Sequence, residues 1–251
     1  MRKILTNITL LSFVLVLFSH CKKSAEFSSA PLQNYMNLQV GKYVIYRLDS
    51  TQFVNYGQTT VKINYQAKDE IDAAITDNLG RPGFRVIRYL RDTAGQNPWT
   101  PNSTYMIVPV EKSIEVIAEN FRYLKLMLPI KEGFNWKGNN YITLYSSNDQ
   151  NWDYGYLDDW DYTYQNVDAP FTVFNNQVVD STITVNERDE VSGHPEDLST
   201  FSEINFSLEV YGKGIGLIYR DFLHRQYQPP TGGNPGYILG YGIKLNMISH
   251  N

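Results

Sequence analysis

Cysteine is nearly absent from this chain of 251 residues, which has one, at position 21. No intramolecular disulfide can form, so packing alone has to stabilise the fold if the protein resides in an oxidising compartment. Basic residues are also few: 22 Lys and Arg stand against 26 Asp and Glu, which gives a formal net charge of −4. Nucleic-acid-binding surfaces are strongly basic, so we expect no nucleic acid among the partners.

Sequence motifs of enzymes and cofactor sites are missing too. Beyond residue 20 only His194, His224 and His250 remain, with no His-Glu-x-x-His pair for zinc and no Gly-x-Ser-x-Gly nucleophile elbow. The glycines of GKGIG, residues 212–216, precede an aromatic, strand-like segment rather than a helix. They therefore favour a turn or bulge between strands over a phosphate-binding loop. The sequence predicts no catalytic residue, no metal site and no cofactor.

The N-terminal segment has the composition of a secretory signal. Two basic residues precede a mostly apolar run, residues 4–18, which is shorter than the roughly 20 residues that a membrane-spanning helix needs. Cys21 follows, and LFSHC resembles the lipobox of bacterial lipoproteins, although His20 replaces the usual small residue. We expect a signal peptide over residues 1–20 and a lipidated cysteine with a flexible tether over residues 21–34. A secreted protein with an incidental cysteine is the alternative.

Apolar and polar residues alternate through most of the remaining chain, which is the period of a β-strand with one buried face. The longest alternating segment is TTVKINYQAKDEIDAAIT, residues 59–76. SIEVIAENFRYLKLML, residues 113–128, predicts a hairpin that bends near Glu119 and Asn120. No segment has the period of a long amphipathic helix.

Two C-terminal segments show the same alternation. In SEINFSLEVYGKG, residues 202–214, the polar positions include Glu203 and Glu209, which we expect to face solvent. In GYILGYGIKLNMISHN, residues 236–251, six large apolar or aromatic residues share one side. Long strands joined by short turns predict an all-β fold, a single domain over residues 35–251. We expect an antiparallel meander with little helix that forms a strongly curved sheet or a partly open barrel, with a β-sandwich as the alternative.

Several of these strand-and-turn segments resemble a known family. YMNLQVGKYVIYRLDS, YGKGIGLIYRDFLHRQYQP and GYGIKLNMISHN, in this order, resemble Bacteroidota-type envelope lipoproteins of unknown function. The resemblance implies a lipidated, β-rich protein of the bacterial cell envelope, which we expect at the outer membrane, and it brings no established active site. YGKGIGLIY is also loosely similar to lipoprotein-carrier-like curved sheets that wrap apolar ligands.

NWDYGYLDDWDYTY, residues 151–164, has its aromatic side chains at even positions. If both halves are extended, six rings share one face, and a ring platform beside carboxylates would suit a glycan. Large rings equally fill cores and pair across strands, and Leu157-Asp158-Asp159 could bend the segment into two paired strands. The candidate ligand-facing residues are Trp152, Tyr154, Tyr156, Trp160, Tyr162 and Tyr164.

Charged residues leave further alternatives open. The aspartates around residue 158 lack the spacing of an EF-hand, which favours solvated carboxylates over a calcium site. Five arginines could gather an anion if their strands are neighbours, or could pair with Asp and Glu: Arg85, Arg88, Arg91, Arg220 and Arg225.

The predicted function is that of a lipid-anchored envelope protein. It would attach to the membrane through its anchor and bind an apolar ligand such as a lipid, a glycan or another envelope protein, or serve as a scaffold. A hydrolase of envelope or polysaccharide material that uses an Asp/Glu pair is the alternative, since two carboxylates can meet in space without a sequence motif. The oligomeric state is open.

Overall fold

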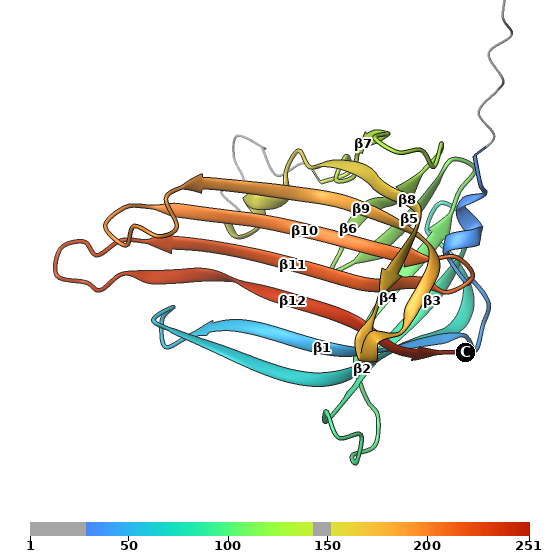
Figure 1. Cartoon of the computed structure of the whole chain (residues 1–251), viewed down its shortest axis with the longest axis horizontal. Helices are drawn as coiled ribbons and strands as arrows, with labels where there is room; N and C mark the ends of the chain where they lie inside the picture. The colour runs from blue at the N-terminus through green and yellow to red at the C-terminus, as the bar shows by residue number, and fades with distance from the viewer. Residues whose placement is uncertain (1–28, 143–151) are drawn as a thin grey trace, which may run out of the picture.

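A computed structural model describes residues 29–142 and 152–251, and gives only the backbone for residues 152–154 (Figure 1). The predicted signal peptide and Cys21 lie outside the described residues. Three short 3-10 helices are η1 (Leu32–Tyr35), η2 (Trp152–Leu157) and η3 (Phe174–Asn176). The strands are β1 (Tyr43–Val54), β2 (Thr59–Thr76), β3 (Pro82–Arg91), β4 (Thr100–Pro109), β5 (Ser113–Ala118), β6 (Phe121–Met127), β7 (Asn135–Lys137), β8 (Asp161–Thr172), β9 (Val178–Gly193), β10 (Ser202–Gly212), β11 (Gly216–Gln228) and β12 (Tyr237–His250).

All twelve strands belong to one antiparallel sheet in the order β6-β5-β4-β3-β2-β1-β12-β11-β10-β9-β8-β7. The first and last strands of the chain, β1 and β12, pair in the middle of this order. The sheet curls until its edge strands β6 and β7 approach each other, so the barrel is closed except for one seam. The all-β prediction and the partly open barrel are confirmed, and no α-helix occurs in the described ranges.

Isolated hydrogen bonds, rather than a strand ladder, join the two sides of the seam. The Leu124 N–H donates to the carbonyl of Gly138 at 2.8 Å, and Trp136 Nε1 donates to the carbonyl of Leu124 at 2.7 Å. The hydroxyl of Tyr164 accepts from the Met127 N–H and donates to the Met127 carbonyl, both at 2.9 Å. The exposed edges that an open sheet would present are thereby satisfied in part.

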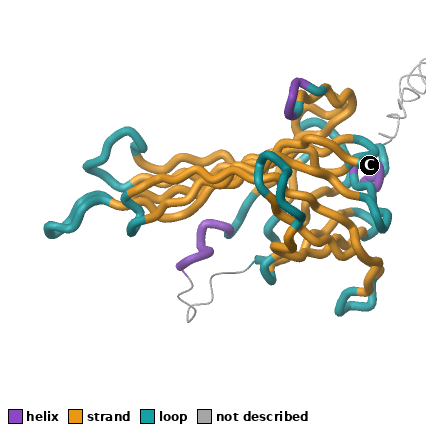
Figure 2. Tube along the Cα trace, turned by 90° about the horizontal axis from the view of Figure 1, so that it is seen from below, coloured by secondary structure: helices purple, strands orange, loops and turns teal. Residues whose placement is uncertain are grey.

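Beyond the barrel, six strands continue as a flatter sheet that we call the wing (Figures 1 and 2). Pairing of β8 with β9 ends at Asn186, and pairing of β3 with β2 begins at Gln66. The wing consists of residues 51–54, 59–65, 188–193, 202–207, 223–228 and 237–242. Its inner face is the continuation of the barrel interior.

Several local predictions are confirmed. β2 spans residues 59–76, the predicted ribbon. The β5–β6 hairpin turns at Glu119 and Asn120, whose φ angles of 52° and 65° are those of a tight turn between twisted strands. The glycines at 212–216 form the β10–β11 turn rather than a phosphate loop.

Residues 29–34 correct the predicted tether. Leu32 in η1 is buried, the Ile130 N–H donates to Ser29 Oγ at 2.8 Å, and the Gly214 N–H donates to the Asn34 carbonyl. The last part of the segment 21–34 therefore packs on the body, because its apolar side chain at position 32 finds a place in the core.

The core occupies both faces of the sheet. Apolar and aromatic side chains fill the barrel interior, and the β8–η3–β9 connection folds over the outer face, where Val173 is buried and the Phe171 and Tyr219 rings lie 5.2 Å apart. Within the described ranges, no helix has both the length and the apolar composition to cross a membrane.

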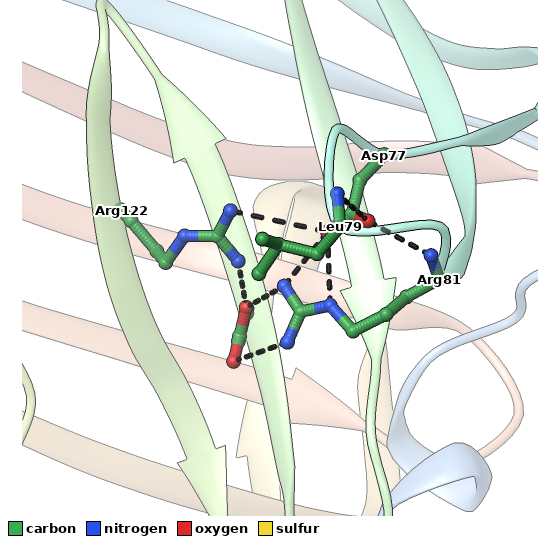
Figure 3. A network of polar contacts seen from close by, with 5 residues as sticks. Asp77, Leu79, Arg81 and Arg122 are labelled. Carbon is green, nitrogen blue, oxygen red and sulfur yellow. Dashed lines mark hydrogen bonds and ion pairs between the residues drawn. The ribbon is translucent and has the colours of Figure 1, made fainter.

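On the outside of the barrel, a balanced cluster of two acids and two arginines fixes the β2–β3 turn against β5 and β6 (Figure 3). Asp77 accepts the N–H groups of Leu79 and Arg81, both at 2.9 Å. The Arg81 guanidinium bridges Asp77 at 2.7 Å and Glu115 at 2.8 Å, and Arg122 also pairs with Glu115. Each acid has a basic partner, so this cluster has a structural role.

Candidate binding face and interior ion cluster

The predicted row of six aromatic residues does not form. Residues 152–157 are a 3-10 helix, not a strand, and a turn at 158–159 separates them from β8. The rings of Trp160, Tyr162 and Tyr164 are 2%, 1% and 0% exposed and belong to the core, so these three cannot face a ligand. The side chains of Trp152 and Tyr154 lie outside the described part.

Tyr156 alone of the described candidates reaches a partly open surface. Its ring stacks on His224 of β11, with centroids 3.7 Å apart and planes inclined by 8°. Trp160 Nε1 donates to the Tyr156 carbonyl at 2.6 Å, and the Trp160 ring stacks on Phe222, which fixes η2 against the inner face of the sheet where barrel and wing meet. Burial, with Tyr241 nearby, raises the pKa of Tyr156.

One side of β12 passes from the core to the open surface of the wing. Met247 and Leu245 are fully buried inside the barrel. Further along the same side, Tyr241, Leu239 and Tyr237 are 39%, 47% and 38% exposed. The strand register places these three side chains on the inner side of the sheet, because Tyr241 lies opposite His224 and its ring contacts Phe222 at 5.0 Å. The predicted stripe over residues 236–251 is therefore real, and half of it is uncovered.

Polar side chains border these rings. His224 Nδ1 donates to Asn205 Oδ1 at 2.7 Å, and Asn205 Nδ2 donates to Glu203 Oε1 at 2.9 Å. Gln226 lies opposite Leu239. We call the surface formed by Tyr156, His224, Tyr241, Leu239 and Tyr237, with these polar neighbours, the inner wing face.

Immediately below the inner wing face, the barrel interior holds buried charges. Lys125 Nζ donates to Glu187 Oε1 at 2.6 Å and to Glu209 Oε1 at 2.9 Å. Ser207 Oγ donates to Glu187 at 2.7 Å, and the Tyr211 hydroxyl donates to Glu209. Arg220 completes the cluster, with Nε 3.6 Å from Glu209 Oε1.

Two β-bulges aim these charges inward. In β6 the register passes from Leu126 to Leu124 and leaves Lys125 without a cross-strand partner, and in β9 it passes from Arg188 to Asn186 and leaves Glu187 unpaired in the same way. An extra residue at a bulge redirects its side chain. Simple alternation along either strand does not reveal this placement.

The two glutamates have opposite electrostatic settings. Burial and the charge of Glu209 raise the pKa of Glu187. Burial would also raise the pKa of Glu209, but the charges of Lys125 and Arg220 and the Tyr211 hydrogen bond outweigh it and lower the pKa to about 2. Glu209 is therefore the permanently ionised member of the pair.

Glu209 also overturns an expectation about β10. The predicted wet face is the inner one: Asn205, Ser207 and Glu209 are buried, whereas Ile204 and Phe206 on the other side are half-buried. Pairing with Lys125, 84 residues away in the chain, makes burial of the carboxylate tolerable.

For three of the five arginines, the structure favours pairing with polar or acidic neighbours over a shared anion site. Arg85 binds Asp72, Arg88 binds Asp69 through two contacts of 2.6 Å, and Arg91 donates to Gln66. Arg88 faces the barrel interior as Arg220 does, because its partner Asp69 lies on the same side of β2 as Ala67, which is buried opposite Tyr46.

A separate shallow groove of about 410 Å³ lies along β8 and β9, lined by Asp161, Thr163, Gln165, Asn186, Arg188, Asp189 and Glu190. Among the described residues, no three His, Cys, Asp or Glu gather in a way that could hold a metal ion. The chain matches no protein-family model, no curated protein and no solved structure.

Proposed function

We propose that this protein is a lipid-anchored binding module of the bacterial cell envelope, and that the inner wing face binds a glycan. The observation that supports the proposal best is the β12 stripe, in which Tyr241, Leu239 and Tyr237 remain 38–47% exposed while the same side of the strand is core further on. An uncovered aromatic stripe continuous with a core is the kind of apolar surface that marks a binding site.

The polar border favours a glycan over an acyl chain. Sugar rings offer CH faces that stack on tyrosine rings, and hydroxyl groups that need hydrogen-bond partners. The inner wing face offers rings at Tyr237 and Tyr241 and amides or carboxylates at Asn205, Gln226 and Glu203. A lipid tail would take water away from Glu203 and Gln226, which are half-buried, without offering hydrogen bonds in exchange, and this costs free energy.

Hydrolysis has weaker support. The structure does bring two carboxylates together, Glu187 and Glu209, and shifts their pKa values apart as an acid–base pair requires. Their side chains are, however, 1% and 2% exposed and already saturated by Lys125, Ser207 and Tyr211. A substrate bond cannot reach them in this arrangement.

Affinity electrophoresis in gels that contain a panel of soluble polysaccharides tests the binding proposal. We expect at least one polysaccharide to retard the wild-type protein and to lose that effect on the double variant Tyr237→Ala/Tyr241→Ala. Base stacking on aromatic residues gives about 1–3 kcal/mol per ring, and a similar loss per tyrosine predicts at least a tenfold weaker interaction.

The matched control is Tyr141→Ala. This tyrosine is also exposed, at 54%, but it follows β7, and its ring contacts Arg122 of β6 rather than the inner wing face. Retardation that the control variant loses equally, or that the double variant keeps, would refute the assignment of the inner wing face.

The anchor has its own test. Cys21→Ser should move the protein from the membrane fraction to the soluble fraction of the cell envelope, because acyl chains add about 0.8 kcal/mol per buried methylene. Unchanged partitioning would contradict lipidation.

A further inference from the structure

Arg220 occupies the point on β11 where the barrel interior opens onto the wing. It lies opposite Glu209 on β10 and Leu245 on β12, and the next residues on its side of the strand are Phe222 and His224. Phe222 in turn contacts the Tyr241 ring of the inner wing face, with centroids 5.0 Å apart. Arg220 is thus the cation nearest to the rings of the inner wing face along β11.

The guanidinium makes no hydrogen bond to any described residue. Its Nε is buried without a hydrogen-bond partner, and the Glu209 oxygen at 3.6 Å is too far away to supply one. The side chain as a whole is 30% exposed, and Nε is its one nitrogen that is both buried and unpartnered, so the terminal nitrogens keep some access to solvent.

Arg88 shows how an interior arginine with a full set of partners is bound. Arg88, in the same interior, makes a two-pronged contact with Asp69, whose second oxygen also accepts from the Tyr105 hydroxyl. Glu209 does not serve Arg220 in this way, because its oxygens accept from Lys125 and Tyr211 and lie no closer to Arg220 than 3.6 Å. The fold thus holds a fixed guanidinium whose paired donors are unused.

A guanidinium in this position has the geometry for one carboxylate. Its fork of parallel N–H groups matches the two oxygens of a carboxylate, and hydrogen bonds between such charged groups are stronger than neutral ones. Phe222 lies 5.5 Å from the guanidinium carbon and restricts the orientation of the planar group.

We propose that Arg220 binds the carboxylate of an acidic sugar whose ring stacks on the tyrosines of the inner wing face. This inference rests on the proposed function and specifies its ligand class: a glycan that contains uronic acid residues. The neutral sugars of such a glycan would lie along Tyr241, Leu239 and Tyr237, and one acidic sugar would lie at the barrel end.

The surrounding charges permit one anion. Lys125 and Arg220 balance Glu187 and Glu209, so the cluster carries no net negative charge that would repel an anion. Further along the wing, Glu203 repels additional anions, while Glu190 is paired with Arg188. We therefore expect a preference for a single acidic position rather than for a polyanion of high charge density.

Isothermal titration calorimetry with two matched probes tests the inference: a short neutral oligosaccharide that carries one uronic acid residue, and the same oligosaccharide with that carboxyl group methyl-esterified. We expect the wild-type protein to bind the acidic form about ten- to a hundredfold more tightly, because a hydrogen bond to a charged group is worth about 1.5–3 kcal/mol. In Arg220→Gln this preference should disappear while the esterified form still binds.

Arg225→Gln is the matched control, because it removes the same charge from β11 five positions along, where alternation places the side chain on the opposite face of the sheet. Arg220→Lys keeps the charge without the fork and should retain only part of the preference. Circular dichroism of each variant checks the fold, and the wild-type comparison of the two probes needs no variant.

Equal affinity of the wild-type protein for both probes would overturn the inference and leave glycan binding intact. A preference that persists in Arg220→Gln would also overturn it. Binding of neither probe, together with no retardation by any polysaccharide in the gel experiment, would overturn the proposed function as well.

Discussion

Replacement of Lys125 by methionine tests whether the interior cluster is held together as described. Lys125 makes two charge-assisted hydrogen bonds, of 2.6 Å to Glu187 and 2.9 Å to Glu209, and both carboxylates are almost fully buried. Each such bond contributes about 1.5–3 kcal/mol, and loss of one partner of a buried ion pair costs about 3–5 kcal/mol. Since a domain is stable by only about 5–15 kcal/mol, Lys125→Met should remove a large part of that.

The assay is urea-induced unfolding at neutral pH, followed by tryptophan fluorescence. Lys137→Met is the matched control, because Lys137 also bridges two carboxylates, Asp159 at 2.6 Å and Asp161 at 3.0 Å, but does so in solvent. Surface pairs of this kind contribute little, so the control should unfold close to the wild type.

A second variant separates charge from packing. In Lys125→Met/Glu187→Gln one of the two orphaned carboxylates is gone, so part of the lost stability should return. If Lys125→Met unfolds at the same urea concentration as Lys137→Met, or if Glu187→Gln restores nothing, then the charges do not stabilise the barrel interior and the reasoning about the bulges fails.

Two other changes have outcomes that follow from the contacts. Tyr164→Phe leaves the Met127 N–H and carbonyl at the seam without their partner, and should lower the free energy of unfolding in urea by about 1–3 kcal/mol. The control is Tyr219→Phe, which should cost less, because the Tyr219 hydroxyl reaches Asp221 at 3.1 Å on the outer face. Equal losses in the two variants would mean that Tyr164 does not close the seam. Glu209 has a pKa of about 2 in the folded protein against 4.5 without the fold, so its contribution is complete above pH 4.5 and is lost as the pH falls toward 2. The raised pKa of Glu187 acts in the opposite direction, because the folded protein gains stability as the pH falls below the pKa that Glu187 has in the folded state. Glu209→Gln should therefore reduce the fall of the urea midpoint at acidic pH, and Glu187→Gln should increase it. Identical pH profiles of the two variants would contradict both assignments.

The fold class could be predicted because its signals are local. The period-two pattern of residues 59–76 depends only on which side chains face the core, and the Glu119-Asn120 turn depends on backbone preferences at two positions. One turn after another of this kind specifies a meander, and a meander of long strands must curl.

The candidate site could not be predicted, because its residues depend on contacts between distant segments. The even spacing of rings in residues 151–164 suggested a strand, but the first half winds as η2 so that Tyr156 can stack on His224, 68 positions later in the sequence. The alternation of β10 predicted that Glu209 faces solvent. Its partner Lys125 lies on another strand, 84 residues away, and the side chain of Lys125 is turned inward by a bulge that alternation does not reveal.

The position of the β1–β12 pair in the middle of the sheet has a consequence for how the molecule is assembled. The N–H of Tyr43 donates to the side chain of Asn251 across 208 residues, so β1 has no partner on that side until the last residues of the chain have arrived. During synthesis, which proceeds from the N-terminus, one flank of the growing sheet therefore stays unprotected to the end. Around the sheet the strands follow one another as a simple meander, and the natural chain begins and ends in the middle of it, at β1 and β12. A circular permutant that began at β7, joined β12 to β1 and ended at β6 would keep the same strand neighbours. Every pair of neighbouring strands would then also be consecutive in the sequence. Such a chain should fold faster than the natural one, since fewer of its contacts would span the full length.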